Sequence, residues 1–196
     1  MARSITDICN VSLGMNGARR IADIAEDSEN ARLCNTFYRP SVEEVLCMYH
    51  WSRAKHTKVV TSDATYETDT FDYGYAYRFP FPANPYCLEV RSVNGNFYDW
   101  QPEGRFVYTD QETCEMVYTK LITDTNEFNP LLAEAISVQL AIRLSFPLKQ
   151  ANRLRLELIE YLETVVLDRA KTVDAREGFI KDEKGKHSWR KAGGRA

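Results

Sequence analysis

The longest run of apolar positions at helical spacing lies between Ser28 and Ala54. Asp27 and Ser28 are both natural caps for its first turn, and Glu29 places a negative charge where the helix dipole favours one. Pro40 lies in the middle, so the helix is expected to bend or restart there. We expect Trp51, at the end of the stripe, to be buried. The apolar stripe consists of Ala31, Cys34, Tyr38, Val42, Val45 and Tyr49, widened by Leu33, Phe37 and Leu46.

Three further helices are predicted. Ser4 and Asp7 have the spacing of a capping box, which places the start of a first helix. Asn129-Pro130 combines a cap with the residue best suited to a first turn, and that helix is expected to end before Pro147. The last helix is predicted from about Lys149 to Asp174, with Gly178 ending the regular region.

Between the helices the periodicity shortens toward two, which indicates strands. Residues 57–74 are expected to form a loop or a weak edge strand. Asn94-Gly95 favours a type I′ turn, because both positions accept positive φ. The turn predicts a hairpin that joins the strand around Leu88–Val93 to a strand Phe97–Trp100. A second strand pair is predicted for Arg105–Thr109 and Glu115–Lys120.

These elements predict a mainly α fold with inserted β structure. A discontinuous antiparallel helical bundle would be built from residues 1–56 and 123–175. Residues 57–122 would form a small antiparallel β domain, and residues 176–196 an extended basic C-terminal tail. No run approaches a membrane span, and no secretory leader is expected at the N-terminus.

Charge is unevenly distributed along the chain of 196 residues and net charge −3. Residues 176–196 hold seven Lys or Arg against three Asp or Glu, a net +4, so the rest carries −7. An acidic body argues against general nucleic-acid coating. The tail has too few apolar residues to fold alone, so it is expected to find order on a partner. Five cysteines, an odd number at irregular spacing, are expected to be reduced and mostly buried.

Candidate chemistry is sparse. Cys47-x-x-His50, with His56 and Cys34, is the best metal-ligand set, but no second close pair completes it. No glycine-flanked nucleophile, phosphate loop or dinucleotide motif is present. The adjacent carboxylates Glu43/Glu44 are interpreted as a solvated helix edge, and Asp182/Glu183 lie in the tail. We therefore expect a protein that is not an enzyme and has no cofactor or metal.

Aromatic residues alternate with period two through Phe71, Tyr73, Tyr75, Tyr77, Phe79 and Phe81. Such a row can stack nucleic-acid bases. Here Arg78 is the one basic residue in the row, and acidic residues precede it. A strand packed on a sheet, or a tyrosine-rich protein interface, is the favoured interpretation.

The run from Ile21 to Ala54 contains I-x-x-I, then DSENARLCN-x-FY, then EEVL and HWSRA. This run resembles the head-to-tail adaptor family of short-tailed phages, the tail tubular protein A type. A looser resemblance continues through Tyr75–Pro80, around Tyr108 and Tyr118, and from Phe128 to Pro147. None of these pieces is a catalytic signature.

The resemblance implies a structural virion protein, assembled in the host cytoplasm without a membrane. It implies a ring of twelve subunits between the portal protein and the tail nozzle protein, around a channel through which genomic DNA passes without specific binding. The C-terminal extension would reach the portal, and the β domain would face the nozzle. The expected portal-binding residues are Phe179, Ile180, Lys186, Trp189, Arg190 and Lys191, and the expected nozzle-facing residues are Tyr73, Tyr75, Asn94 and Gly95. The alternative is a DNA-binding packaging or head-completion factor that contacts DNA through its basic tail, which would weaken steeply with salt.

Overall fold

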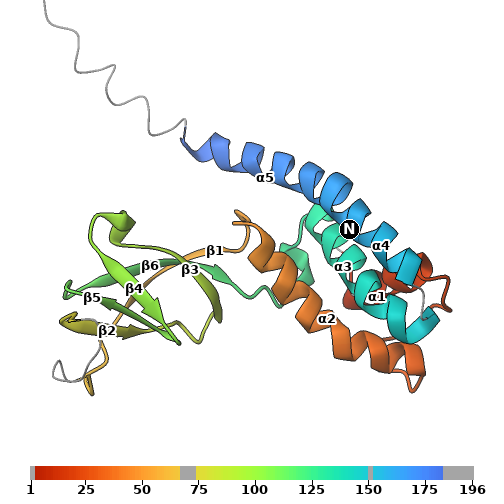
Figure 1. Ribbon diagram of the computed structural model, residues 1–196, viewed down its shortest axis with the longest axis horizontal. Helices are drawn as coiled ribbons and strands as arrows, with labels where there is room; N and C mark the ends of the chain where they lie inside the picture. Colours follow the sequence, from red (N-terminus) through yellow and green to blue (C-terminus); the bar gives the residue numbers. More distant parts are fainter. Residues whose placement is uncertain (1–2, 67–73, 150–151, 183–196) are drawn as a thin grey trace, which may run out of the picture. The chain divides into compact units, whose positions relative to one another are not determined.

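The computed structural model describes residues 3–66, 74–149 and 152–182, in a mixed arrangement of helices and two small antiparallel sheets (Figure 1). The chain separates into two compact units. The first comprises the chain up to Val45, Trp51–Arg53, and the chain from Thr123 onward; the second comprises Leu46–His50 and Ala54–Ile122. The first unit is therefore assembled from segments far apart in sequence.

The two N-terminal helices begin at the expected caps. The hydroxyl of Ser4 accepts a hydrogen bond from the Asp7 N–H (3.1 Å), and the Asp7 carboxylate accepts one from the Ser4 N–H (2.9 Å), which starts α1 (Ile5–Met15). The Ser28 hydroxyl accepts from the Ala31 N–H (3.2 Å) at the start of α2 (Glu29–Met48). Helix α2 continues through Pro40 without a restart.

Helix α3 (Pro130–Lys149) is the centre of the first unit. The side chain of Asn129 accepts from the Leu132 N–H (2.7 Å), as the Asn-Pro pair predicts. Every residue from Ala135 to Ile142 is buried, because neighbouring elements cover the helix on all sides. The expected end before Pro147 is wrong: α3 includes this proline in its last turn, where it removes one backbone hydrogen bond and only Leu148 and Lys149 follow it in the helix.

Length and composition alone would let α3 cross a membrane, which corrects the expectation that no run approaches a span. Its mean hydropathy is 1.4 over the relevant window, and 67% of that window is buried inside the structure. A buried core helix of a soluble protein passes the same test, so the match is weak evidence for a membrane.

Helix α1 packs on α3 through two buried hydrogen bonds, from Ser12 to the Ser137 carbonyl (2.7 Å) and from Asn16 to the Ala141 carbonyl (3.0 Å).

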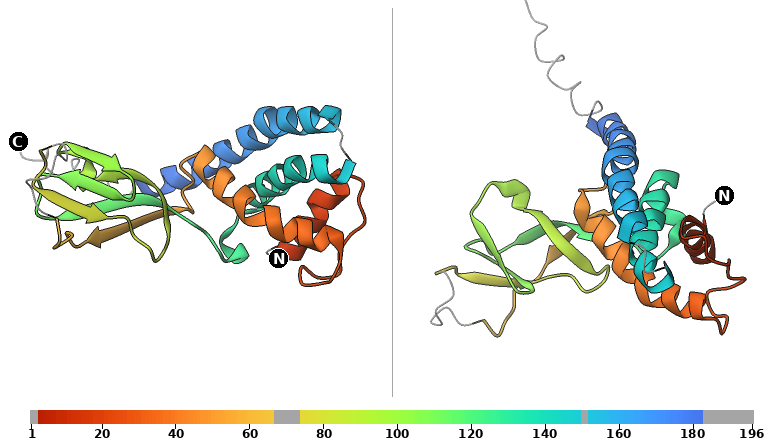
Figure 2. Two further views of the ribbon diagram at one scale, coloured as in Figure 1. Left: turned by 60° about the horizontal axis from the view of Figure 1, so that its bottom comes forward. Right: turned by 45° about the vertical axis from the view of Figure 1, so that its right-hand side comes forward.

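The C-terminal helices α4 (Asn152–Tyr161) and α5 (Leu167–Asp182) run on through a π-helical turn, Leu162–Val166, as one curved rod (Figures 1 and 2). Side chains spaced four residues apart shift gradually around the surface of an α-helix, because one turn takes 3.6 residues. One wider turn offsets part of that drift and keeps the repeat facing the unit's core. The buried repeat is Leu158, Leu162, Val166, Ala170 and Asp174.

The helix does not end where the sequence predicts. It passes through Gly178 and ends at Asp182, so residues 176–182 of the predicted extended tail are helical. A glycine inside a helix costs only about 1 kcal/mol relative to alanine, which the contacts of the preceding turn can offset.

The second unit holds two three-stranded antiparallel sheets. One has the order β1 (Lys55–Val60), β6 (Cys114–Lys120), β3 (Cys87–Val93). The other has the order β2 (Tyr77–Pro80), β5 (Phe106–Thr109), β4 (Trp100–Glu103). Strand β1 is an edge strand, as expected for part of residues 57–74. Both sheets contribute to one core, which contains Phe79, Cys87, Val93, Val107, Cys114, Met116 and Tyr118.

The predicted strand pairs are wrong. Strands β3 and β4 belong to different sheets, and so do β5 and β6. The turn has the expected local geometry, with φ of 47° at Asn94 and 66° at Gly95. Asn96 also has a positive φ of 59°, and the short 3₁₀ turn Asn94–Asn96 directs the chain from one sheet to the other.

Candidate interaction surfaces

Two acidic residues of α5 bind the segment that follows α2. Both carboxylate oxygens of Asp174 accept from the Ser52 N–H (3.0 and 2.9 Å), and one also accepts from the Ser52 hydroxyl (2.7 Å). Asp174 is only 3% exposed. One turn further on, Glu177 pairs with Arg53, with 3.2 Å between Nε and Oε2. These contacts therefore hold α5 to the first unit between Asp174 and Glu177.

The residues predicted to bind the portal follow this anchor. Phe179 and Ile180 lie in the last turn of α5, three and two residues before Asp182, where the helix ends. Lys186, Trp189, Arg190 and Lys191 lie outside the described residues, as does Glu183. The segment that follows the described helix carries most of the basic residues of the predicted tail: residues 183–196 hold five of the seven Lys or Arg in residues 176–196, and one Glu.

In the second unit, residues Gly95–Asp99 are all exposed, and we call them the aromatic loop. Phe97 is 84% exposed and Tyr98 is 54% exposed. Two adjacent exposed aromatic side chains are a common feature of protein-binding surfaces. Sequence reasoning assigned both residues to a strand, which would have buried one of them. The run of three turn-forming residues, Asn94–Asn96, was the available signal that the strand starts later.

The predicted nozzle-facing residues have different structural roles. The Asn94 amide donates to the Thr113 carbonyl (2.8 Å) and accepts from the Glu115 N–H (2.8 Å), so it fastens the loop to the start of β6. Gly95 has positive φ, and a Cβ added there would lie 2.7 Å from the Phe97 ring. Tyr75 is half-buried, and its carbonyl accepts from the Tyr66 hydroxyl (3.0 Å). Tyr73 lies outside the described residues.

The alternating aromatic row packs into the second unit's core over its described part. Phe79 is fully buried, and Tyr77 and Phe81 pack against the same cluster. This confirms the interpretation as a strand packed on a sheet for Tyr77 and Phe79, whereas Phe81 follows the end of β2. Phe71, like Tyr73, lies outside the described residues.

The single basic residue of that row is held inside its own unit. Arg78 lies over the rings of Tyr66 (5.0 Å) and Phe106 (4.5 Å) and pairs with Asp63 at 2.6 Å. Hydrogen bonds from the Thr65 hydroxyl and N–H, and from Arg78, lower the pKa of Asp63 to about 2. The guanidinium of Arg78 thus contacts Asp63 and two aromatic rings of its own unit, which does not favour a contact with a phosphate backbone.

The candidate metal ligands are not brought together. Cys34 and Cys47 are thirteen positions apart on α2, which is roughly 20 Å along a helix. His50 lies 3.9 Å from Glu89, and His56 makes an edge-on contact with Tyr118. Within residues 3–66, 74–149 and 152–182, no group of three His, Cys, Asp or Glu side chains could hold a metal ion.

Glu43 and Glu44 have different partners, which corrects their interpretation as one solvated helix edge. Glu43 pairs with Arg39 one turn earlier (2.8 Å). Glu44 is held by α3: it accepts from Arg143 (2.6 Å) and from Gln139. The two adjacent carboxylates point in different directions on the helix, and only one of them connects α2 to α3.

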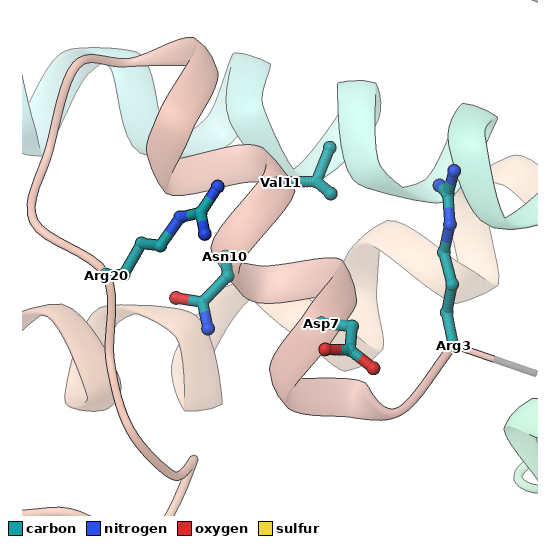
Figure 3. A pocket seen from close by; sticks show the side chains of 5 residues that line it. All are labelled: Arg3, Asp7, Asn10, Val11 and Arg20. Carbon is teal, nitrogen blue, oxygen red and sulfur yellow. The ribbon is translucent and has the colours of Figure 1, made fainter.

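The described residues of the first unit line at least two hollows. One, of about 310 Å³, is lined by Arg3, Asp7, Asn10, Val11 and Arg20 (Figure 3). Its two arginines lie at opposite ends of the group, and Arg3 is paired with Glu134 (3.2 Å), so they do not converge on one anion. The other, of about 260 Å³, is lined by Leu131, Glu134, Tyr161, Val165, Val166 and Arg169. Neither hollow contains a cysteine, serine or histidine to act as a nucleophile with its base.

A scan against known protein families finds no match for this chain, and a search of curated proteins finds no relative.

Proposed function

We propose that the chain is a structural component of a short-tailed phage: an adaptor that forms a ring between the portal and the tail nozzle. By the resemblance the ring has twelve subunits and surrounds the DNA channel of the virion. The observation that carries the proposal is the attachment of α5 to the first unit. A buried Asp174 and the Arg53–Glu177 pair hold the helix nine and six residues before the basic segment begins at residue 183.

The residues that carry the resemblance have definite structural roles, which supports transferring the fold expectation with them. Asn30 and Asn35 donate to the carbonyls of Arg19 (2.8 Å) and Ile24 (2.7 Å). In HWSRA, Trp51 is fully buried and Ser52 binds Asp174. The quoted run thus includes residues that hold the first unit together, rather than only generic helix formers.

The surfaces suit an assembly protein better than an enzyme. The basic segment and the aromatic loop are two separate candidate contact regions, as a protein between two partners requires. An acidic body would let DNA slide through a channel without adhering, since like charges repel. The portal-facing role belongs to the basic segment and the nozzle-facing role to the aromatic loop.

Ending the chain at Asp182 should abolish attachment to the portal while leaving the fold intact. The shortened chain keeps Asp174, Glu177 and all of α5, so its melting temperature should equal that of the full chain within about 1 °C. The measurement is co-sedimentation with purified portal of the same phage. Trp189→Ala should weaken attachment by about tenfold or more, as burial of one aromatic anchor commonly does. Ser188→Ala is the matched control and should have no effect.

Equal attachment of the full and shortened chains would overturn the role of the tail. If the shortened chain attaches normally but loses salt-sensitive binding to duplex DNA, the alternative function as a DNA-binding packaging or head-completion factor is favoured instead.

Replacing the two aromatic residues of the aromatic loop together, Phe97→Ala with Tyr98→Ala, should change the free energy of unfolding by less than about 0.5 kcal/mol, because exposed side chains contribute little to stability. Addition of the nozzle protein to adaptor-bearing particles should nevertheless fail. Val59→Ala, at another exposed apolar position (71% exposed) in the same unit, is the control. Normal nozzle addition to the double variant would show that the loop is not the contact.

A further inference from the structure

Strand β1 lies at the edge of its sheet, and its outward side is open. In an antiparallel ladder, alternate residues bond to the neighbouring strand, and the residues between them point their N–H and C=O groups away from it. The Ala54 carbonyl accepts from the Lys120 N–H (2.8 Å), in register with β1 and β6. The bonds to β6 therefore fall on the even-numbered residues of β1, and the backbone groups of Lys55, Thr57 and Val59 point outward. Among the described residues, none hydrogen-bonds to these three N–H and three C=O groups.

The other three edge strands of the two sheets are less suited to pair with a further strand. Strand β3 is interrupted by two shifts of register, which make an edge a poor template. Strand β4 contains Pro102, which has no N–H to donate. Strand β2 ends with Pro80, and its Arg78 carbonyl already accepts from the Asp63 N–H (2.8 Å). Strand β1 contains no proline, and all six of its residues pair with β6 without a shift.

The three residues with outward backbone groups also present their side chains to solvent. Lys55, Thr57 and Val59 are exposed, whereas His56 and Val60 on the opposite face of the strand are half-buried. Since side chains alternate along a strand, an added strand would place every second side chain beside one of these three residues. The edge thus offers a row with a lysine at one end and a valine at the other, four positions apart.

The charge of this edge favours an acidic strand. Strand β1 contains Lys55, Lys58 and no acidic residue, although the chain outside the predicted tail carries −7. The Lys58 ammonium donates to the Asn84 carbonyl (3.0 Å), and no ion pair of the described residues includes Lys55. Glu115 lies opposite Val59 in the ladder. A further carboxylate is therefore favourable beside Lys55 and unfavourable beside Val59, because like charges on neighbouring strands repel.

A second copy of β1 is a poor partner for the same edge. Pairing β1 with itself would bring four lysines into two adjacent strands. Lysine on an edge strand opposes such association of identical edges. The same positive charge attracts a strand that carries a carboxylate.

We propose that the open edge of β1, formed by Lys55, Thr57 and Val59, is a docking site for an extended acidic segment of a partner protein. The segment adds a fourth strand to the sheet of β1, β6 and β3, with a carboxylate beside Lys55 and an apolar side chain beside Val59. In strand addition the backbone hydrogen bonds supply affinity, and the alternate side chains supply specificity. The edge is separate from the aromatic loop, and the inference does not rest on the proposed function.

The test uses the full chain and two labelled peptides with blocked ends, TVTTTET and its reverse TETTTVT. They place glutamate and valine four positions apart for antiparallel and for parallel addition, and at least one of them should bind. Amide hydrogen exchange should then slow at Lys55, Thr57 and Val59, whose N–H groups are open, and change little at His56 and Lys58, which already bond to β6. Lysine in place of the peptide's glutamate should weaken binding by about fivefold or more.

Two variants of the chain test the backbone and the charge separately. Thr57→Pro should weaken peptide binding by about tenfold or more, because proline removes an outward N–H that β6 does not use and its ring blocks the edge. Thr57→Ala keeps this N–H and is the matched control, with binding within about twofold of the unaltered chain. Lys55→Glu should reverse the preference, so that the lysine-bearing peptide binds better than the glutamate-bearing one by about fivefold.

Failure of both peptides to bind at about 1 mM would overturn the docking site. Binding that leaves hydrogen exchange at Lys55, Thr57 and Val59 unchanged would overturn it as well, since the peptide would then lie elsewhere. Equal binding of the glutamate and lysine peptides would overturn the acidic character of the partner. If the full chain associates with itself and the Thr57→Pro chain does not, the edge binds a second copy and the proposed partner is wrong.

Discussion

Replacing Trp51 with alanine should lower the free energy of unfolding by about 3–5 kcal/mol, the range for truncating a buried aromatic side chain. Trp51 is fully buried, and its indole N–H donates to the Val45 carbonyl at 2.8 Å. The substitution removes both the packing and the hydrogen-bond donor. Chemical denaturation of the two chains measures the difference.

Two controls separate these contributions. Trp51→Phe keeps most of the volume but leaves the Val45 carbonyl without its donor, so a smaller loss of about 1–3 kcal/mol is expected. Phe97→Ala removes a comparably large side chain that is 84% exposed and should change stability by less than about 0.5 kcal/mol. A loss below about 1 kcal/mol for Trp51→Ala would contradict its role in the core.

Asp174→Ala should cost about 2–4 kcal/mol, because it removes a buried carboxylate and leaves the part-buried donors of Ser52 without their acceptor. The loss should be accompanied by faster hydrogen exchange in the turns of α5 around Glu177, since both contacts hold the same helix end. Denaturation and exchange measurements on one sample test both parts.

Asp168→Ala is the matched control, because Asp168 is an exposed carboxylate on the same helix. It should change stability by less than about 0.5 kcal/mol. If Asp168→Ala and Asp174→Ala have equal effects, the Ser52 contact does not anchor α5.

Local signals in the sequence predicted local structure well. The Ser4/Asp7 capping box, the Ser28 cap and the Asn129-Pro130 start all depend on groups within four residues of each other, and each occurs as expected. The burial of Trp51 followed from its place at the end of a helical stripe. In these cases the deciding interactions are contained in the sequence window.

Strand pairing was predicted wrongly because it depends on distant residues. Asn94 and Gly95 adopt the positive φ values that the dipeptide favours, yet the chain then joins the other sheet. Which strands pair depends on how the two sheets pack their side chains into one common core. The same error concealed the aromatic loop, since a residue assigned to a returning strand is not expected to be exposed.

The helix end at Gly178 was wrong for a related reason. The glycine lowers helix stability only slightly, whereas Asp174 and Glu177 are fixed by Ser52 and Arg53, more than a hundred residues away in sequence. The link from Glu44 to α3 is equally invisible to periodicity. The charge contrast of the tail, by comparison, could be counted from the sequence directly.

The most direct test of the proposed function is electron cryomicroscopy of intact phage particles that contain this chain. The proposal predicts a closed ring of density at the head–tail junction, between the portal and the nozzle, into which the first and second units fit as separate bodies. Particles made with the chain ending at Asp182 should be DNA-filled heads without this ring or a tail. Purified particles that lack the chain, or that carry it at any other position, would contradict the proposal.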